Sequence, residues 1–232
     1  MNELLLGAEA LLSALFVLGA WRYARDRLYT VIIILLILIA SVGGKLVEFF
    51  GHVTNTGNIF YAAVFLATYF LIERMGKREG IYSIWVGVIG VASFFVFIQI
   101  TVALVGFPPT AEFNAVLASA FAPFSQVTAA SLIAYVLSQN LNVYLYVYLK
   151  QKMRGTRIWL RANICNLIAQ MLDSVVFFTI AFWGVVPPEN ITDIIMTGFV
   201  VKVAFIAVSA PLLYLNRVEQ DDEKGMAMIA VR

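Results

Sequence analysis

The stretch that decides the fold is residues 157–184, RIWLRANICNLIAQMLDSVVFFTIAFWG. It is long and apolar enough to cross a bilayer as one helix, because about 20 such residues suffice. Hydrocarbon is a poor solvent for its polar members, which are Arg161, Asn163, Asn166, Gln170 and Asp173. On a helix that turns about 100° per residue, the last four fall within an arc of roughly 80°, and Phe177 extends the same stripe. Such groups can hold helices together, but five exceed what helix association needs.

The composition places the chain among integral membrane proteins. Of its 232 residues, 62% are hydrophobic and only 13% are charged, which leaves room for about six or seven helical spans. The net charge of +2 gives no indication of a nucleic-acid partner. Cys165 is the single cysteine, so no internal disulfide can form. The sequence contains no CxxC or HExxH spacing, and we expect no metal, no cofactor and no enzymatic activity.

Seven apolar segments follow one another along the chain. They are residues 4–20, 28–50, 58–73, 81–106, 114–149, 157–184 and 191–215. The first lacks a basic front and a cleavage site, which favours a retained helix over a signal peptide. The fifth is too long for one span, and Pro123 divides it. This predicts a short interfacial or re-entrant piece near 111–122, followed by a helix from about 124 to 149.

The distribution of basic residues predicts the orientation. Thirteen of the 16 Lys and Arg residues fall in alternate loops or in the tail, and loops 51–57, 107–113 and 187–190 carry none. By the positive-inside rule, the N-terminus lies outside and the C-terminus in the cytoplasm. The three remaining cations are Lys45, Arg161 and Lys202, all within apolar segments. Arg161 is close enough to the cytoplasmic rim to reach water along its stem.

The other charges in apolar segments predict a wet cavity. We expect Lys45, Glu48, Asp173 and Lys202 to share a layer between the midplane and the outer leaflet, because lone charges there would be prohibitive. A stripe on the second segment joins Ser41, Lys45 and Glu48. The fifth segment has a comparable stripe, made of Thr128, Ser131, Tyr135, Ser138 and Asn142 with Gln139 beside it. We interpret its small residues as close-packing positions.

Roughly residues 40–215, and most specifically 159–184, resemble the queuosine-precursor transporters, also labelled putative vitamin uptake transporters. The resemblance rests on Trp159, Leu160, Arg161, Asn163, Gln170, Asp173, Phe177, Ala181 and Phe182. The run SLIAYVLSQNLNV, ATYFLIERMG with Glu73, and the positions of Lys45 and Lys202 support it. It implies one all-α polytopic domain over 1–232. Residues 28–215 form a six-helix core, 1–27 an additional N-terminal helix with its basic loop, and 216–232 a cytoplasmic tail.

The resemblance also implies a function, which is import of a 7-deazaguanine across the plasma membrane by a secondary carrier. Asn and Gln side chains offer both donors and acceptors to a purine-like edge, and a carboxylate can accept two N–H bonds. We expect Asp173 and Gln170 to read that edge and Phe177 or Tyr69 to stack on the ring. Lys202 would neutralise Asp173 when the site is empty, and a proton is the candidate coupling ion. The full predicted site is Asn163, Asn166, Gln170, Asp173, Phe177, Lys202, Lys45, Glu48, Tyr69 and Gln139.

Three departures from the family pattern leave the ligand open. Tyr69 stands where members usually carry Asp, Gln126 where they carry Arg, and Cys165-Asn166 where they carry a Ser-Thr pair. One alternative is a substrate-binding subunit of an energy-coupling-factor transporter. Another is a seven-helix photoreceptor with retinal on Lys202, although no carboxylate stands in the middle of the third segment as its counter-ion. A membrane-embedded enzyme is the third. The lipid bilayer is an expected partner, and the oligomeric state stays open, a homo-oligomer included.

Overall fold

The protein is an α-helical bundle with one small hairpin. A computed structural model describes residues 2–23, 25–49, 52–121, 124–154, 157–182 and 199. The elements in chain order are α1 (Asn2–Tyr23), α2 (Arg25–Val42), β1 (Leu46–Phe49), β2 (His52–Asn55), α3 (Gly57–Met75), α4 (Lys77–Ala103), the 3₁₀ turn η1 (Pro108–Thr110), α5 (Ala111–Phe121), α6 (Phe124–Lys152) and α7 (Ile158–Phe182). The predicted all-α polytopic membrane class is confirmed.

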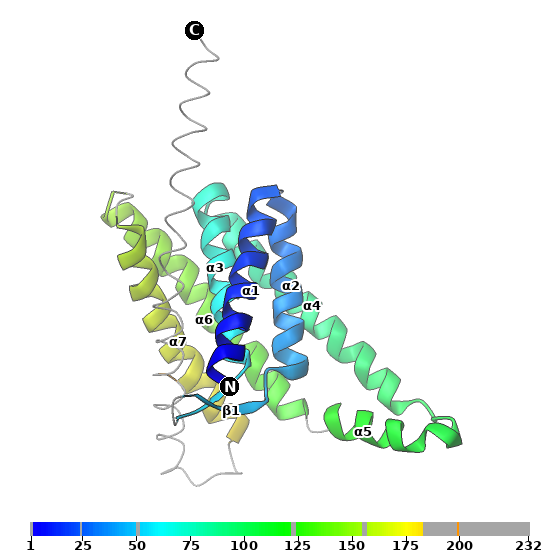
Figure 1. Ribbon diagram of the computed structural model, residues 1–232. Helices are drawn as coiled ribbons and strands as arrows, with labels where there is room; N and C mark the ends of the chain where they lie inside the picture. Colours follow the sequence, from blue (N-terminus) through cyan, green and yellow to red (C-terminus); the bar gives the residue numbers. More distant parts are fainter. Residues whose placement is uncertain are drawn as a thin grey trace.

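Four of the described helices are long and apolar enough to cross a membrane, namely α1, α3, α4 and α7. The predicted seventh segment, 191–215, lies outside the described residues. Helices α1, α3 and α6 end at the top of the bundle in Figure 1, and each has basic residues in its last turn. We call this the basic end. Its assignment to the cytoplasm stays a prediction.

Helix α3 is the centre of the bundle. Every residue from Gly57 to Ile72 is buried, because α1 and α2 pack against one side of it while α6 and α7 lie on another (Figure 1). The Trp21 ring of α1 stacks on Phe70 of α3 with centroids 5.2 Å apart, and Val17 is fully buried. The N-terminal helix is therefore packed into the core.

The second apolar segment does not form the single helix that the sequence predicted. Helix α2 ends at Val42, and residues 46–49 pair antiparallel with 52–55 in a hairpin. The Gly57 N–H donates to the Gly43 carbonyl over 3.1 Å. A Cβ on Gly43 would lie 2.5 Å from the Ile39 carbonyl oxygen, so the chain needs glycine at this close approach. The predicted helical stripe through Ser41, Lys45 and Glu48 is therefore wrong.

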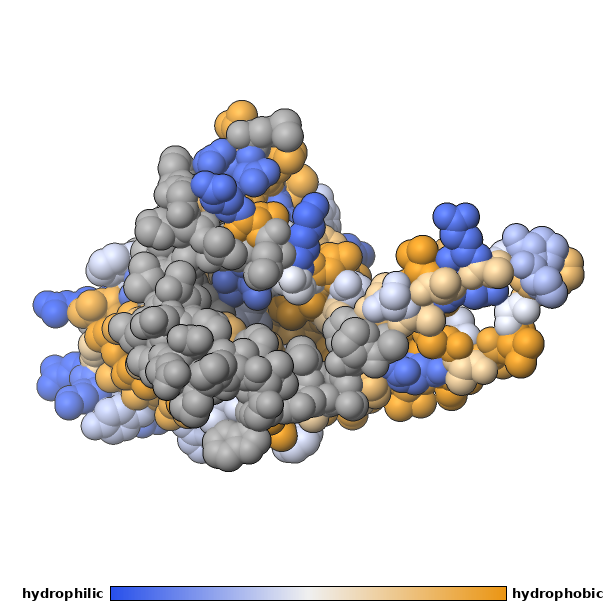
Figure 2. Space-filling view, turned by 90° about the horizontal axis from the view of Figure 1, so that it is seen from below, coloured by the Kyte–Doolittle hydropathy of each residue, from blue (hydrophilic) through white to orange (hydrophobic). Residues whose placement is uncertain are grey.

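The division of the fifth segment at Pro123 is confirmed. Helix α5 ends at Phe121 and α6 begins at Phe124. The second half of α4 and the short α5 project from the bundle as an arm (Figure 1), and Figure 2 shows apolar residues over much of its surface. Its large exposed side chains include Val96, Phe97, Ile100, Leu104, Phe107, Phe113 and Val116. A surface of this kind suits lipid.

Candidate functional site

Polar side chains recur at helical spacing on the facing sides of α3, α6 and α7. Residues four apart lie on one face of a helix, and α7 runs antiparallel to α6 (Figure 1). We call the resulting set the polar column: Tyr61, Tyr69 and Glu73 of α3; Ser138, Gln139, Asn142 and Lys150 of α6; Arg161, Asn166, Gln170 and Asp173 of α7. From Tyr61 to Glu73 it follows α3 for roughly 18 Å.

The first layer of the polar column, farthest from the basic end, surrounds Asp173. The Tyr61 hydroxyl donates to Asp173 Oδ1 over 3.0 Å. The Ser138 hydroxyl lies 3.0 Å from the Tyr61 hydroxyl and 3.4 Å from the same carboxylate oxygen. Ser138 is fully buried and Asp173 is 7% exposed. Three helices thus converge on one carboxylate, which accepts hydrogen bonds from hydroxyl groups.

The second layer is a bridge made by Tyr69. Its hydroxyl lies 2.7 Å from Oδ1 of Asn142 and 2.7 Å from Oδ1 of Asn166. A phenol has one proton, so it donates to one amide, and the other amide must turn its nitrogen toward it. The Tyr69 ring stacks on Tyr146 with centroids 4.4 Å apart. Tyr69 is therefore fixed at both its ring and its hydroxyl.

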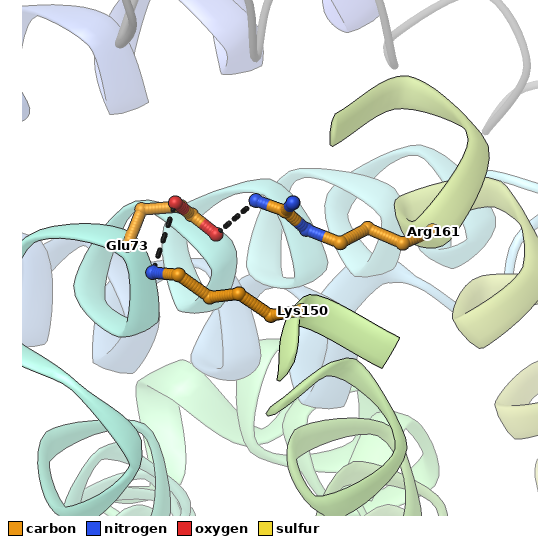
Figure 3. A network of polar contacts seen from close by, with 3 residues as sticks. All are labelled: Glu73, Lys150 and Arg161. Atoms are coloured by element: carbon orange, nitrogen blue, oxygen red, sulfur yellow. Dashed lines mark hydrogen bonds and ion pairs between the residues drawn. The ribbon is translucent and has the colours of Figure 1, made fainter. Parts of the chain in front are cut away.

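The third layer, at the basic end, is a cluster of three charges (Figure 3). Arg161 Nη2 lies 2.6 Å from Glu73 Oε1, and Lys150 Nζ lies 3.1 Å from Glu73 Oε2. The expectation that Arg161 reaches water along its stem is wrong, because its side chain is 0% exposed. The strong attraction of Glu73 across the helix interface holds the guanidinium inside the bundle.

Between the first two layers the protein leaves buried amide atoms without partners. Gln139 is fully buried, and neither its Nε2 nor its Oε1 has a hydrogen-bond partner among the described residues. The same holds for Gln170 Oε1 and Asn142 Nδ2. Each unpaired buried polar atom costs about 1–3 kcal/mol. Such a cost is offset when a ligand supplies the missing hydrogen bonds, which makes this part of the polar column a candidate binding site.

The structure brings together half of the predicted site residues. Asn166, Gln170, Asp173, Tyr69 and Gln139 are all buried in the polar column. Lys202 lies outside the described residues.

Four predicted site residues do not join the column. Asn163 is partly exposed, and its side-chain N–H donates to the Trp159 carbonyl of its own helix over 2.8 Å. Phe177 is also partly exposed and contacts Phe178, with ring centroids 5.1 Å apart. Lys45 and Glu48 are exposed at the hairpin. The predicted layer that these two charges share with Asp173 and Lys202 falls partly outside the described residues and stays a prediction.

Sequence reasoning missed Tyr61 and interpreted Ser138 as a packing residue. The signal for Tyr61 is its spacing, since Tyr61, Tyr69 and Glu73 recur at multiples of four along α3. In an apolar segment an isolated tyrosine is indistinguishable from an ordinary core residue. Within the described residues, no group of His, Cys, Asp and Glu is arranged to hold a metal ion. The donors and acceptors of the site suit binding of a neutral polar solute.

Comparisons with known proteins identify a family and two related chains. Residues 55–216 match the family described as "Putative vitamin uptake transporter". The chain is 29% identical over 188 residues to the "Probable queuosine precursor transporter" of Bacillus subtilis, covering 78% of this chain and 80% of that protein. It is 27% identical over 140 residues to the "Queuosine precursor transporter" of Escherichia coli, covering 59% of each. No solved structure matches.

Proposed function

Because the chain belongs to the putative vitamin uptake transporter family, we propose that it carries a queuosine precursor across the membrane. The family is one of transporters and not of enzymes, which agrees with the sequence-based expectation. The class of solute we propose is a 7-deazaguanine, such as 7-cyano-7-deazaguanine. The names of the Bacillus subtilis and Escherichia coli relatives support this class.

The observation that carries the proposal is the set of unpaired amide atoms beside Asp173. A deazaguanine edge presents a carbonyl oxygen, a ring N–H and an exocyclic amine. Asp173 and Gln170 Oε1 would accept from the two nitrogen donors, while Gln139 Nε2 would donate to the carbonyl. A solute without this pattern would leave buried groups unpaired, so the site would discriminate against it.

Tyr69 takes a different role from the one the sequence predicted. Its ring is already stacked on Tyr146, and its hydroxyl is bound to two amides. We therefore propose that Tyr69 forms the floor of the site on the side of the basic end. The hydroxyl also orients Asn142 and Asn166, so that their remaining amide atoms point in fixed directions.

We propose that the chain acts in the plasma membrane as a secondary carrier, without an ATPase subunit. A pairing of Lys202 with Asp173 in the empty state, with a proton as the coupling ion, stays part of this proposal. The alternative in which the chain is a capture subunit for partner ATPases differs in one respect. A capture subunit would bind solute alone but would not transport it alone.

The test is uptake by the purified chain in liposomes. We expect labelled 7-cyano-7-deazaguanine to accumulate in exchange for internal unlabelled solute, without ATP or another protein. Unlabelled guanine and queuine are competitors that measure selectivity. Binding without exchange would favour the capture subunit over the carrier. Absence of both binding and exchange for every deazaguanine would refute the proposed solute class.

A further inference from the structure

The Glu73 layer, defined as Glu73, Lys150 and Arg161, ties three helices together through one carboxylate. Each oxygen of Glu73 takes one cation, Arg161 from α7 and Lys150 from α6 (Figure 3). The Arg161 guanidinium also lies over the Tyr146 ring, 5.0 Å from its centroid. Loss of this single carboxylate would remove the ion pairs that join α3 to α6 and to α7 at the basic end.

The burial of this layer argues against a purely stabilising role. The side chains of Arg161 and Glu73 are 0% and 7% exposed, whereas that of Lys150 is 34% exposed. Removing charges from water offsets most of their mutual attraction, so a buried ion cluster stabilises a fold little better than apolar residues would. The same balance makes the cluster easy to separate once water enters. Such a contact suits a junction that must open and close.

The Glu73 layer lies between the unpaired amides and the basic end of the bundle. Along α3, Glu73 follows Tyr69 by one turn, and on α7 Arg161 lies between Asn166 and the basic end. A solute that leaves the unpaired amides in this direction must pass the Tyr69 bridge and then the Glu73 layer. Both contacts join α3 to α6 and α7. One movement of α3 away from the other two helices would therefore open both.

We propose that the Glu73 layer is a gate that closes the polar column at the basic end. Separation of Glu73 from Arg161 and Lys150 opens the column to water and to the solute. The assignment of a solute to this path rests on the proposed function. The existence of the gate does not rest on the proposed function, and it can be tested on the protein without solute.

Cys165 is a native reporter for the gate. It is the only cysteine in the chain, is fully buried, and lies on α7 one turn from Arg161 and next to Asn166. When the gate is closed, a charged maleimide that does not cross membranes should label it slowly. When the gate opens, labelling should be faster from the basic end than from the opposite end.

The experiment measures labelling of Cys165 in membrane vesicles of both orientations, without added solute. For Glu73→Gln we expect labelling from the basic end to accelerate about tenfold, because loss of two charged contacts shifts a closed–open equilibrium at least that far. The matched control is Glu79→Gln, which removes a carboxylate bound to Tyr29 near the same end. Its labelling rate should equal that of the parent.

Sidedness separates gate opening from unfolding. Equal acceleration from both ends, or a parental rate in folded Glu73→Gln protein, would overturn the gate. If Glu73→Gln does not fold, Lys150→Gln takes its place, with Lys152→Gln as the control on the same helix. We expect a smaller one-sided acceleration for Lys150→Gln, and an unchanged rate would again overturn the gate. Failure of deazaguanines to bind would refute the proposed solute and leave these outcomes unaffected.

Discussion

The Tyr61 hydroxyl donates to Oδ1 of Asp173 over 3.0 Å, which joins the central helix α3 to α7 inside the bundle. Asp173 was the residue that the sequence marked most strongly, and Tyr61 is the one it did not mark. The bond fixes the direction in which the carboxylate presents its other lone pairs. Tyr61 is therefore a positioning residue for the proposed site.

We expect Tyr61→Phe to weaken binding of 7-cyano-7-deazaguanine by about five- to tenfold, since one hydrogen bond contributes about 1 kcal/mol. The fold should persist, because the ring stays in place against Phe65. Calorimetric titration of the purified protein measures the effect. Tyr29→Phe is the control, since it also removes a hydroxyl–carboxylate bond but lies outside the polar column. Equal affinity for Tyr61→Phe and the parent would contradict this role.

Gln139→Leu should stabilise the empty protein and abolish solute binding. The wild-type amide is fully buried, and neither of its polar atoms has a hydrogen-bond partner among the described residues. A leucine of similar size removes the free-energy cost of burying these unpaired atoms. We expect the apparent Tm to rise by about 2–4 °C per kcal/mol gained, measured by thermal denaturation in detergent. An unchanged or lower Tm together with retained binding would show that Gln139 is satisfied by water and does not contact solute.

The glycine pair at the end of α2 predicts a sharp contrast in stability. Gly43→Ala should lower the apparent Tm by several degrees, because the new Cβ would lie 2.5 Å from the Ile39 carbonyl oxygen. Gly44→Ala should have little effect, since a Cβ there meets nothing within 4 Å. Similar melting temperatures for the two variants would mean that the hairpin tolerates displacement from Gly57.

The sequence predicted the polar face of α7 well but could not predict where that face ends. Asn166 and Gln170 lie near the centre of the stripe, Asp173 lies at one edge, and all three are buried. Asn163 lies at the opposite edge, where its side chain donates to the Trp159 carbonyl of the same helix. Helical periodicity predicts the direction in which a side chain points only to within about 100°, the rotation between successive residues. It cannot say which neighbour will cover the edge of the face.

The second apolar segment shows a different limit. Its hydrophobicity continues through LVEFF at 46–50, so length alone predicted one helix. The helix ends at Val42 because Gly43 contacts Gly57, which lies beyond the hairpin in the sequence. A hydrophobicity pattern does not register such a contact. Valine and phenylalanine also favour strands, and a count of hydrophobic residues does not take this preference into account. Tyr61 was missed for a related reason, because its partner Asp173 lies 112 residues away.

The buried polar groups around Asp173 form the proposed binding site for a 7-deazaguanine. The most direct test of this site is equilibrium binding of 7-cyano-7-deazaguanine to purified parent, Asp173→Asn and Asn163→Ala proteins. Asn163→Ala is the matched control, because Asn163 lies on the same helix but outside the polar column. We predict parental affinity for Asn163→Ala and loss of binding for folded Asp173→Asn. Equal binding by all three proteins would contradict the assignment of the site.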